Sequence, residues 1–297
     1  MTLRFLIRSA ALLTLFAAVA GAQTSVTTDP VGFASVNCPS NSDTFASIPF
    51  TRPPEFVGSL QTVSTDTLSV SGSPWAANQF VYAAGTQPKT YYVILGKAST
   101  VNPKEGSSYL VTANGTNTLT INLQGDNLST VPAGTQITVI PYATLASVFP
   151  AGDANVSFVP SPSLFSRQTE ILIPSYGASG TNLAAAATYF FFNGAWRKFG
   201  TDSTQDHGDD PLANNGYVII RNAGTASKLT ANGAVSLRKE TVQIVSRSAT
   251  QQDNFVSVTR PVNVALNDLG LISSGAFASS PSLIASQVEP QMRQTRK

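Results

Sequence analysis

Two apolar runs separated by Asn193-Gly194 constrain the fold of this chain more than any other stretch. The runs, 188–192 and 195–199, are rich in aromatic residues. Asn-Gly favours the two-residue turn of a hairpin, because both turn positions need positive φ. The stretch therefore predicts an antiparallel β-hairpin. An acidic loop and another β-rich run, 215–221, follow it.

Short β-rich segments recur elsewhere between clusters of Gly, Asn and Pro, a spacing typical of antiparallel all-β proteins. Asn-Gly begins at positions 114, 193, 215 and 232, and we expect a tight turn at each. The expected strands are Thr44–Phe50, Thr67–Ser71, Thr90–Leu95, Ser108–Ala113, Thr118–Leu123, Thr135–Ile140, Glu170–Ile173, Tyr217–Arg221 and Asn254–Thr259. The expected short helical turns are Thr144–Phe149, Leu183–Thr188 and Leu283–Val288.

A weak internal repeat suggests that the chain contains two related antiparallel β units, each sandwich- or barrel-like. Three similar segments occur in the same order in the two halves, which favours a repeat over chance. The matched segments are Thr44–Pro49 with Thr169–Pro174, Thr90–Leu95 with Thr188–Asn193, and Gly106–Thr116 with Asn214–Thr225. The expected divisions are a signal peptide at 1–22, β units at 23–160 and 161–262, and a C-terminal segment at 263–297.

The first residues predict export. Arg4 and Arg8 precede the apolar run Ala10–Ala20, and Ala20-Gly21-Ala22 resembles a signal-peptide cleavage site. We expect a secreted, periplasmic or cell-surface protein that begins at Gln23; an uncleaved anchor is the alternative. No later stretch reaches the roughly 20 apolar residues of a membrane-spanning helix.

Composition disfavours nucleic acid as a partner. Charged residues make up 11% of the chain, against about 25% in average soluble domains. Without its first 22 residues the chain has 16 basic and 16 acidic residues, so it has no basic field to attract nucleic acid. Cys38 is the only cysteine, which rules out a disulfide within the chain. We expect a buried thiol; an intermolecular bond is the alternative.

Several longer motifs resemble a family of uncharacterised secreted β-rich bacterial proteins. The resemblance covers nearly the whole mature chain and implies export from a bacterial cell and a β-rich fold. It assigns no catalytic residue. The motifs are Thr27–Phe33, Asn41–Phe45, Pro49–Pro54, Thr138–Pro150 and Leu269–Phe277.

Few catalytic groups are available in this sequence. His207 is the only histidine, there is no G-x-S-x-G motif, and one His with one Cys cannot complete a zinc site. A pair of carboxylates for glycoside hydrolysis remains open. Glu170 is one candidate because it lies within an apolar strand; the alternative is an outward-pointing strand residue.

Two kinds of ligand site are suggested. Trp75 and Trp196 are candidates for stacking on sugar rings, although the run around Trp196 also fits a buried core. Asp202, Asp206, Asp209 and Asp210 crowd one loop that could bind calcium. Their spacing does not match an EF-hand, and a solvated loop tip is the alternative.

The sequence favours a non-enzymatic secreted or cell-envelope β protein with a structural or adhesive role. The alternative is a carbohydrate-binding or carbohydrate-cleaving protein. The expected partners are cell-envelope components or glycans, with calcium as the one candidate cofactor. The oligomeric state stays open.

Overall fold

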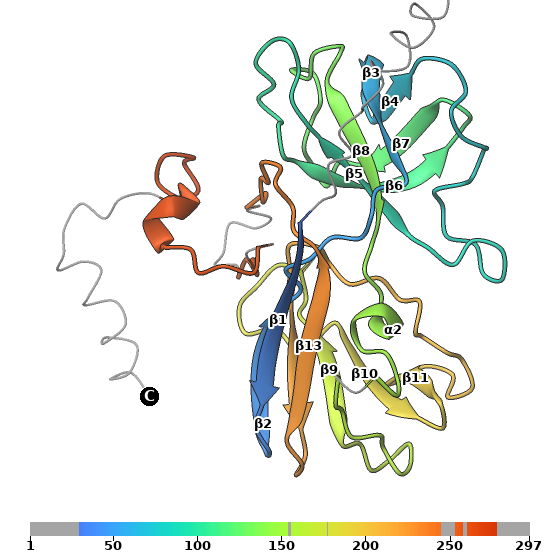
Figure 1. Ribbon diagram of the computed structural model, residues 1–297, viewed down its shortest axis with the longest axis vertical. Coiled ribbons are helices and arrows are strands. Elements are labelled where there is room, and N and C mark those ends of the chain that lie inside the picture. Colours follow the sequence, from blue (N-terminus) through green and yellow to red (C-terminus); the bar gives the residue numbers. More distant parts are fainter. Residues whose placement is uncertain (1–29, 154–155, 177, 245–252, 258–259, 278–297) are drawn as a thin grey trace, which may run out of the picture. The chain divides into compact units, whose positions relative to one another are not determined.

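The computed structural model of the protein (Figure 1) describes residues 30–153, 156–176, 178–244, 253–257 and 260–277. Within these residues the regular secondary structure is almost entirely antiparallel β-strand, which confirms the predicted fold class. The short helix α2 (Leu145–Val148) and the 3₁₀ turn η1 (Leu266–Leu269) are its described helical elements. The predicted signal peptide and the helical turn expected at Leu283–Val288 lie outside the described residues.

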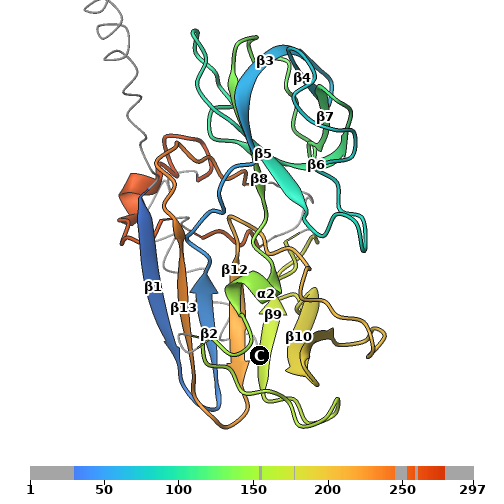
Figure 2. The same cartoon turned by 45° about the vertical axis from the view of Figure 1, so that its right-hand side comes forward.

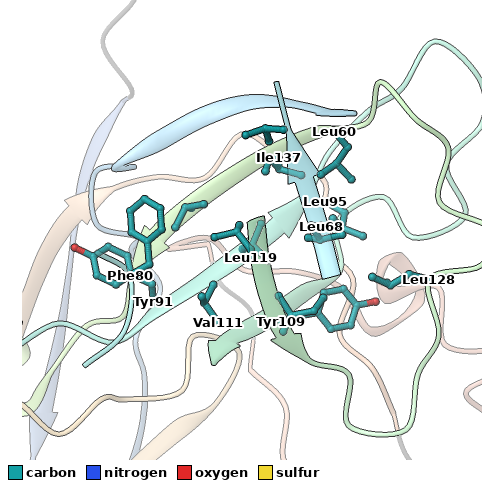
Figure 3. Packing of buried hydrophobic residues seen from close by; sticks show 14 of the residues in the cluster. Leu60, Leu68, Phe80, Tyr91, Leu95, Tyr109, Val111, Leu119, Leu128 and Ile137 are labelled. Carbon is teal, nitrogen blue, oxygen red and sulfur yellow. The ribbon is translucent and has the colours of Figure 1, made fainter. Parts of the chain in front are cut away.

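Six strands close into a barrel in the order β3-β4-β7-β6-β5-β8. Alternation places Leu119 and Ile121 inside the barrel, whereas Thr118 and Thr120 of the same strand face outward. Figure 3 shows the apolar side chains that fill the interior, among them Leu68 and Leu95. The strands are β3 (Phe56–Ser64), β4 (Thr67–Val70), β5 (Tyr91–Leu95), β6 (Ser108–Asn114), β7 (Thr118–Asn122) and β8 (Gln136–Pro141).

A five-stranded sheet has the order β11-β10-β9-β12-β2, and a two-stranded ribbon is formed by β1 and β13. Figure 2 shows α2 and the ribbon beside the strands of the sheet. One face of the sheet packs on both, where Ile171, Trp196 and Leu145 share a core. The strands are β1 (Val31–Cys38), β2 (Ser42–Ser47), β9 (Thr169–Ile173), β10 (Ala187–Phe192), β11 (Ala195–Lys198), β12 (Tyr217–Asn222) and β13 (Ser227–Ala234).

The predicted hairpin is confirmed. Strands β10 and β11 pair directly across Asn193-Gly194, whose φ angles are 49° and 76°. The same dipeptide behaves differently at the other three positions, where neither residue has a positive φ. Asn232-Gly233 even lies inside β13, because its backbone pairs with Phe33 and Gly32 of β1. A tight turn still forms at Asn114-Gly115, where Gly115 N donates to the carbonyl of Thr118, and at Asn215-Gly216, where Gly216 N donates to that of Ala213. The expectation of a tight turn is wrong at Asn232-Gly233.

The helical turn expected at Thr144–Phe149 is present as α2, whose cap is Thr144. The Thr144 hydroxyl accepts from Ser147 N, and the Ser147 hydroxyl accepts from Thr144 N. The turn expected at Leu183–Thr188 is wrong, because Ala187 and Thr188 begin β10 and pair with β9. The strand expected at Asn254–Thr259 is absent over its described residues, where Ser257 N instead donates to the carbonyl of Asn215.

Strand pairing crosses the expected division at residue 160. Strand β2 comes early in the chain, yet it pairs with β12 across all six of its residues. The segments matched as repeats also have different neighbours: β5 lies in the barrel, whereas β10 lies in the open sheet.

Among the described residues, no helix is both long and apolar enough to span a membrane.

Candidate functional site

A cleft with a volume of about 340 Å³ lies among the described residues. Barrel residues from the segment before β6 and from the end of β7 line it, together with loop 213–216 and the segments 241–243 and 254–256. Its surface combines aromatic rings with carboxamides. The aromatic lining residues are Tyr109, Tyr142, Tyr176 and Phe255, and the carboxamides are Asn122, Gln124, Asn214, Asn215, Gln243 and Asn254.

One wall of the cleft carries an ion pair between Lys104 and Asp126. Oδ2 of Asp126 also accepts a hydrogen bond of 2.8 Å from the hydroxyl of Tyr109, and its Oδ1 accepts one of 2.8 Å from Asn127 N. Burial alone would raise the pKa of the Asp126 carboxyl, but hydrogen bonds from Lys104 and Tyr109 outweigh it, and the pKa is lowered. The Asp126 carboxylate is therefore charged at neutral pH, and its hydrogen bonds hold it in position.

Aromatic rings that are held by the backbone form another wall. The Tyr176 hydroxyl accepts a 2.9 Å hydrogen bond from Tyr217 N and donates to the carbonyl of the same residue. Gly216 permits this approach, because a Cβ there would lie 2.4 Å from the hydroxyl oxygen. Phe255 packs edge-on against Tyr176 and Tyr217, at centroid distances of 6.1 and 5.8 Å. The ring of Tyr176 is thus presented to the cleft in one orientation.

The two tryptophans suggested as sugar platforms are buried. Trp75 is 6% exposed in the barrel core, where it packs edge-on against Phe56 and Phe80. Trp196 is 2% exposed in the core between the sheet and α2. A surface position for Trp75 is therefore wrong: the turn that carries it folds over one end of the barrel core, because Asn114 bonds the backbone of Ala76 and Phe80.

The acidic loop is organised by its own hydrogen bonds. Asp206 accepts from Trp196 N at 3.1 Å and from Gly208 N at 2.9 Å. Asp202 accepts from both the backbone and the hydroxyl of Thr204, whereas Asp209 is exposed. The carboxylates of Asp202 and Asp206 thus point toward separate local donors.

His207 is buried beside Asp210, with 3.1 Å between its Nδ1 and Oδ2 of the carboxylate. The Tyr189 hydroxyl donates to that same oxygen at 2.7 Å. Thr201 Oγ1 lies 3.2 Å from His207 Nε2, which gives a hydroxyl, imidazole and carboxylate in series. However, this hydroxyl donates to the carbonyl of Lys198 at 2.9 Å, so it is not presented to the ring as a nucleophile. The series anchors the loop between β11 and β12.

No group of three or more His, Cys, Asp or Glu residues suited to a metal ion occurs in the part of the chain that the structure describes. Calcium at the acidic loop stays a prediction.

If calcium binds to the acidic loop, the melting temperature rises with free calcium, because binding favours the folded state. Thermal melts in calcium and in chelator test this on the wild type and on Asp206→Asn/Asp209→Asn. Equal wild-type melting temperatures in the two buffers would reject the prediction.

Among the described residues, no pair of carboxylates lines the cleft. Asp126 is the one carboxylate among the described lining residues, and its oxygens are bonded as above. Glu170 of β9 forms an ion pair with Arg167 and is not among the residues that line the cleft. Cys38 is buried, and burial raises the pKa of its thiol, as expected for an unreactive residue.

No local sequence pattern predicts the cleft. Its lining comes from at least five separate segments, and none of them carries a local motif. The only sequence signal is a general richness in Asn, Gln and Tyr, which does not reveal which residues meet.

Comparisons with known proteins also leave the cleft unassigned: no family model, curated protein or solved structure matches this chain. The resemblance to secreted bacterial proteins therefore stays a prediction.

Proposed function

We propose that this chain is an exported, non-enzymatic carbohydrate-binding protein with an adhesive role in the cell envelope or outside the cell. The observation that carries the proposal is the cleft of about 340 Å³ with its mixed aromatic and carboxamide lining. Its volume lies within the roughly 300–1,000 Å³ of small-molecule sites.

This lining matches the chemistry of sugars. A sugar ring presents C–H faces, which pack on aromatic rings such as Tyr176 and Phe255. It also presents hydroxyl groups, each of which both donates and accepts. Carboxamides meet that requirement because one side chain carries two donors and one acceptor oxygen. Asn214 and Gln243 supply such groups from different segments of the cleft.

The scarcity of carboxylates in the cleft lining favours binding over cleavage. Glycoside hydrolysis generally needs one carboxylic acid and one carboxylate on opposite sides of the scissile bond. Asp126 is the single acidic residue among the described lining residues, and its lowered pKa makes it a poor proton donor near neutral pH. The predicted signal peptide supports export, and near-neutral composition fits a surface that meets uncharged polymers.

Glycan-array screening of the mature chain, followed by calorimetry, tests the proposal. We expect binding to at least one glycan, and a loss of about tenfold or more in affinity in Phe255→Ala and in Gln243→Ala, since each removes a contact worth about 1.4 kcal/mol or more. Phe165→Ala and Gln61→Ala are matched controls, because both residues are exposed and neither lines the cleft. Both controls should bind as the wild type does.

Other outcomes separate the alternatives. Retention in a washed envelope fraction with no glycan affinity would favour a purely structural role. Release of reducing ends from a bound polysaccharide would indicate cleavage and contradict a non-enzymatic protein. Circular dichroism of each variant must match the wild type, so that lost binding is not lost folding.

A further inference from the structure

We propose that the Lys104–Asp126 ion pair makes the cleft selective for uncharged glycans, excluding both uronates and amino sugars. The inference rests on the proposed function and adds a ligand class to it. It concerns the charge inside the cleft rather than the aromatic wall.

The charges of the lining are few and balanced. Lys104 and Asp126 are the only residues with a formal charge at neutral pH among the described residues that line the cleft. They pair with each other, so the lining has no net charge. The remaining polar lining groups are amides and hydroxyls. A neutral, hydrogen-bonding surface of this kind gives no electrostatic gain to a charged ligand.

The pair is also held in place. The Lys104 side chain is 26% exposed and the Asp126 side chain 11%, so water screens their attraction only in part. Tyr109 and Asn127 donate further hydrogen bonds to the carboxylate. The lysine backbone is fixed as well, because Lys104 N donates to Oδ1 of Asn102 at 3.0 Å. The Asp126 carboxylate cannot turn to a ligand without breaking bonds from Tyr109 or Asn127, and the Lys104 ammonium cannot do so without leaving Asp126.

Charged glycans are excluded because pairing with one of the two residues would leave the other charge uncompensated. A uronate that paired with Lys104 would leave Asp126 without its cation in a partly buried position. An amino sugar that paired with Asp126 would do the same to Lys104. Separating one partner from a buried pair is costly, because the other charge is left uncompensated. Repulsion from the partner of like sign adds to the discrimination.

Charge-neutralising variants test this directly. Asp126→Asn keeps an acceptor for the Tyr109 hydroxyl and frees the Lys104 cation. Lys104→Gln frees the Asp126 anion. The ligands are the uncharged glycan selected on the array, its uronate counterpart and its amino-sugar counterpart. Calorimetry at two salt concentrations measures affinity for each, because a charge-driven gain falls with ionic strength.

The expected results differ for each chain. The wild type should prefer the neutral glycan over both charged counterparts by about tenfold or more, a difference of one buried charge contact. Asp126→Asn should bind the uronate, and only the uronate, with about tenfold higher affinity than the wild type. Lys104→Gln should show the same gain of about tenfold in affinity for the amino sugar alone. The double variant Lys104→Gln/Asp126→Asn should lose both gains, which controls for a general loosening of the cleft.

Failure of this inference can be told from failure of the proposed function. A wild type that binds no glycan contradicts the proposed function. A wild type that binds the neutral glycan through Phe255, but binds its charged counterparts equally well, overturns the charge filter alone. So do folded single variants whose preferences match those of the wild type.

Discussion

Replacing Trp196 with alanine is expected to lower the free energy of unfolding by about 3–5 kcal/mol. The indole is 2% exposed and contacts three aromatic rings, with centroid distances of 5.9 Å to Phe149, 5.1 Å to Phe158 and 5.5 Å to Phe191. Alanine removes this buried surface and leaves a cavity that the surrounding rings fill only in part. These rings come from separate segments, so removal of the indole weakens the packing of those segments against β11.

Urea denaturation followed by circular dichroism measures the effect, with the midpoint and slope fitted together. Phe165→Ala is the control, since this aromatic side chain is 95% exposed and its loss should change stability by about 0.5 kcal/mol or less. A loss below about 1 kcal/mol in Trp196→Ala would contradict a central position for the indole in this core.

Local sequence signals predicted the strands that are decided locally. The aromatic hairpin needed only Asn193-Gly194 and its two flanking runs, and it forms as expected. Asn232-Gly233 carries the same turn signal but lies inside a strand, because β1 supplies a complete pairing partner there. Pairing with a distant strand thus outweighs a dipeptide preference.

The elements that the sequence did not reveal depend on distant partners. Strand β1 alternates exposed and partly buried residues, and it pairs with β13, almost 200 residues later. Trp75 lies in a turn by sequence, yet it is buried because that turn folds over the barrel core. The cleft is the extreme case, since Lys104, Tyr176 and Phe255 meet only through tertiary contacts.

One residue type does keep its role in both matched segments. Asn114 and Asn222 occupy equivalent positions, five residues after Tyr109 and Tyr217, and each ends its strand. Both are buried, at 5% and 2% exposure. Each side chain bonds neighbouring backbone carbonyls. A sequence match therefore identified shared local chemistry even though the two strands belong to different sheets.

Replacing Asn222 with alanine is expected to lower the free energy of unfolding by about 3 kcal/mol or more, because several buried polar groups lose partners worth about 1–3 kcal/mol each. Its Nδ2 donates to the carbonyls of Cys38 and Pro39, at 3.0 and 3.2 Å. Its Oδ1 accepts from the hydroxyls of Thr169 and Ser227, at 3.0 and 3.1 Å. This one carboxamide joins β12 to β9, to β13 and to the turn after β1.

Denaturation of Asn222→Ala, together with amide hydrogen exchange, checks the prediction. Exchange should accelerate most in the turn after β1, because the carbonyls that the carboxamide holds there are released. Asn37→Ala removes an exposed asparagine of β1 and should stay within about 0.5 kcal/mol of the wild type. Asn114→Ala removes the equivalent side chain from the barrel, where the backbone of Phe80 and Ala76 loses its partner instead. Because the two asparagines share no partner and serve separate cores, their losses in free energy of unfolding should add in the double variant to within about 0.5 kcal/mol.

A stable Asn222→Ala variant with unchanged exchange in the turn after β1 would contradict the prediction, because it would show that water replaces the carboxamide there without cost.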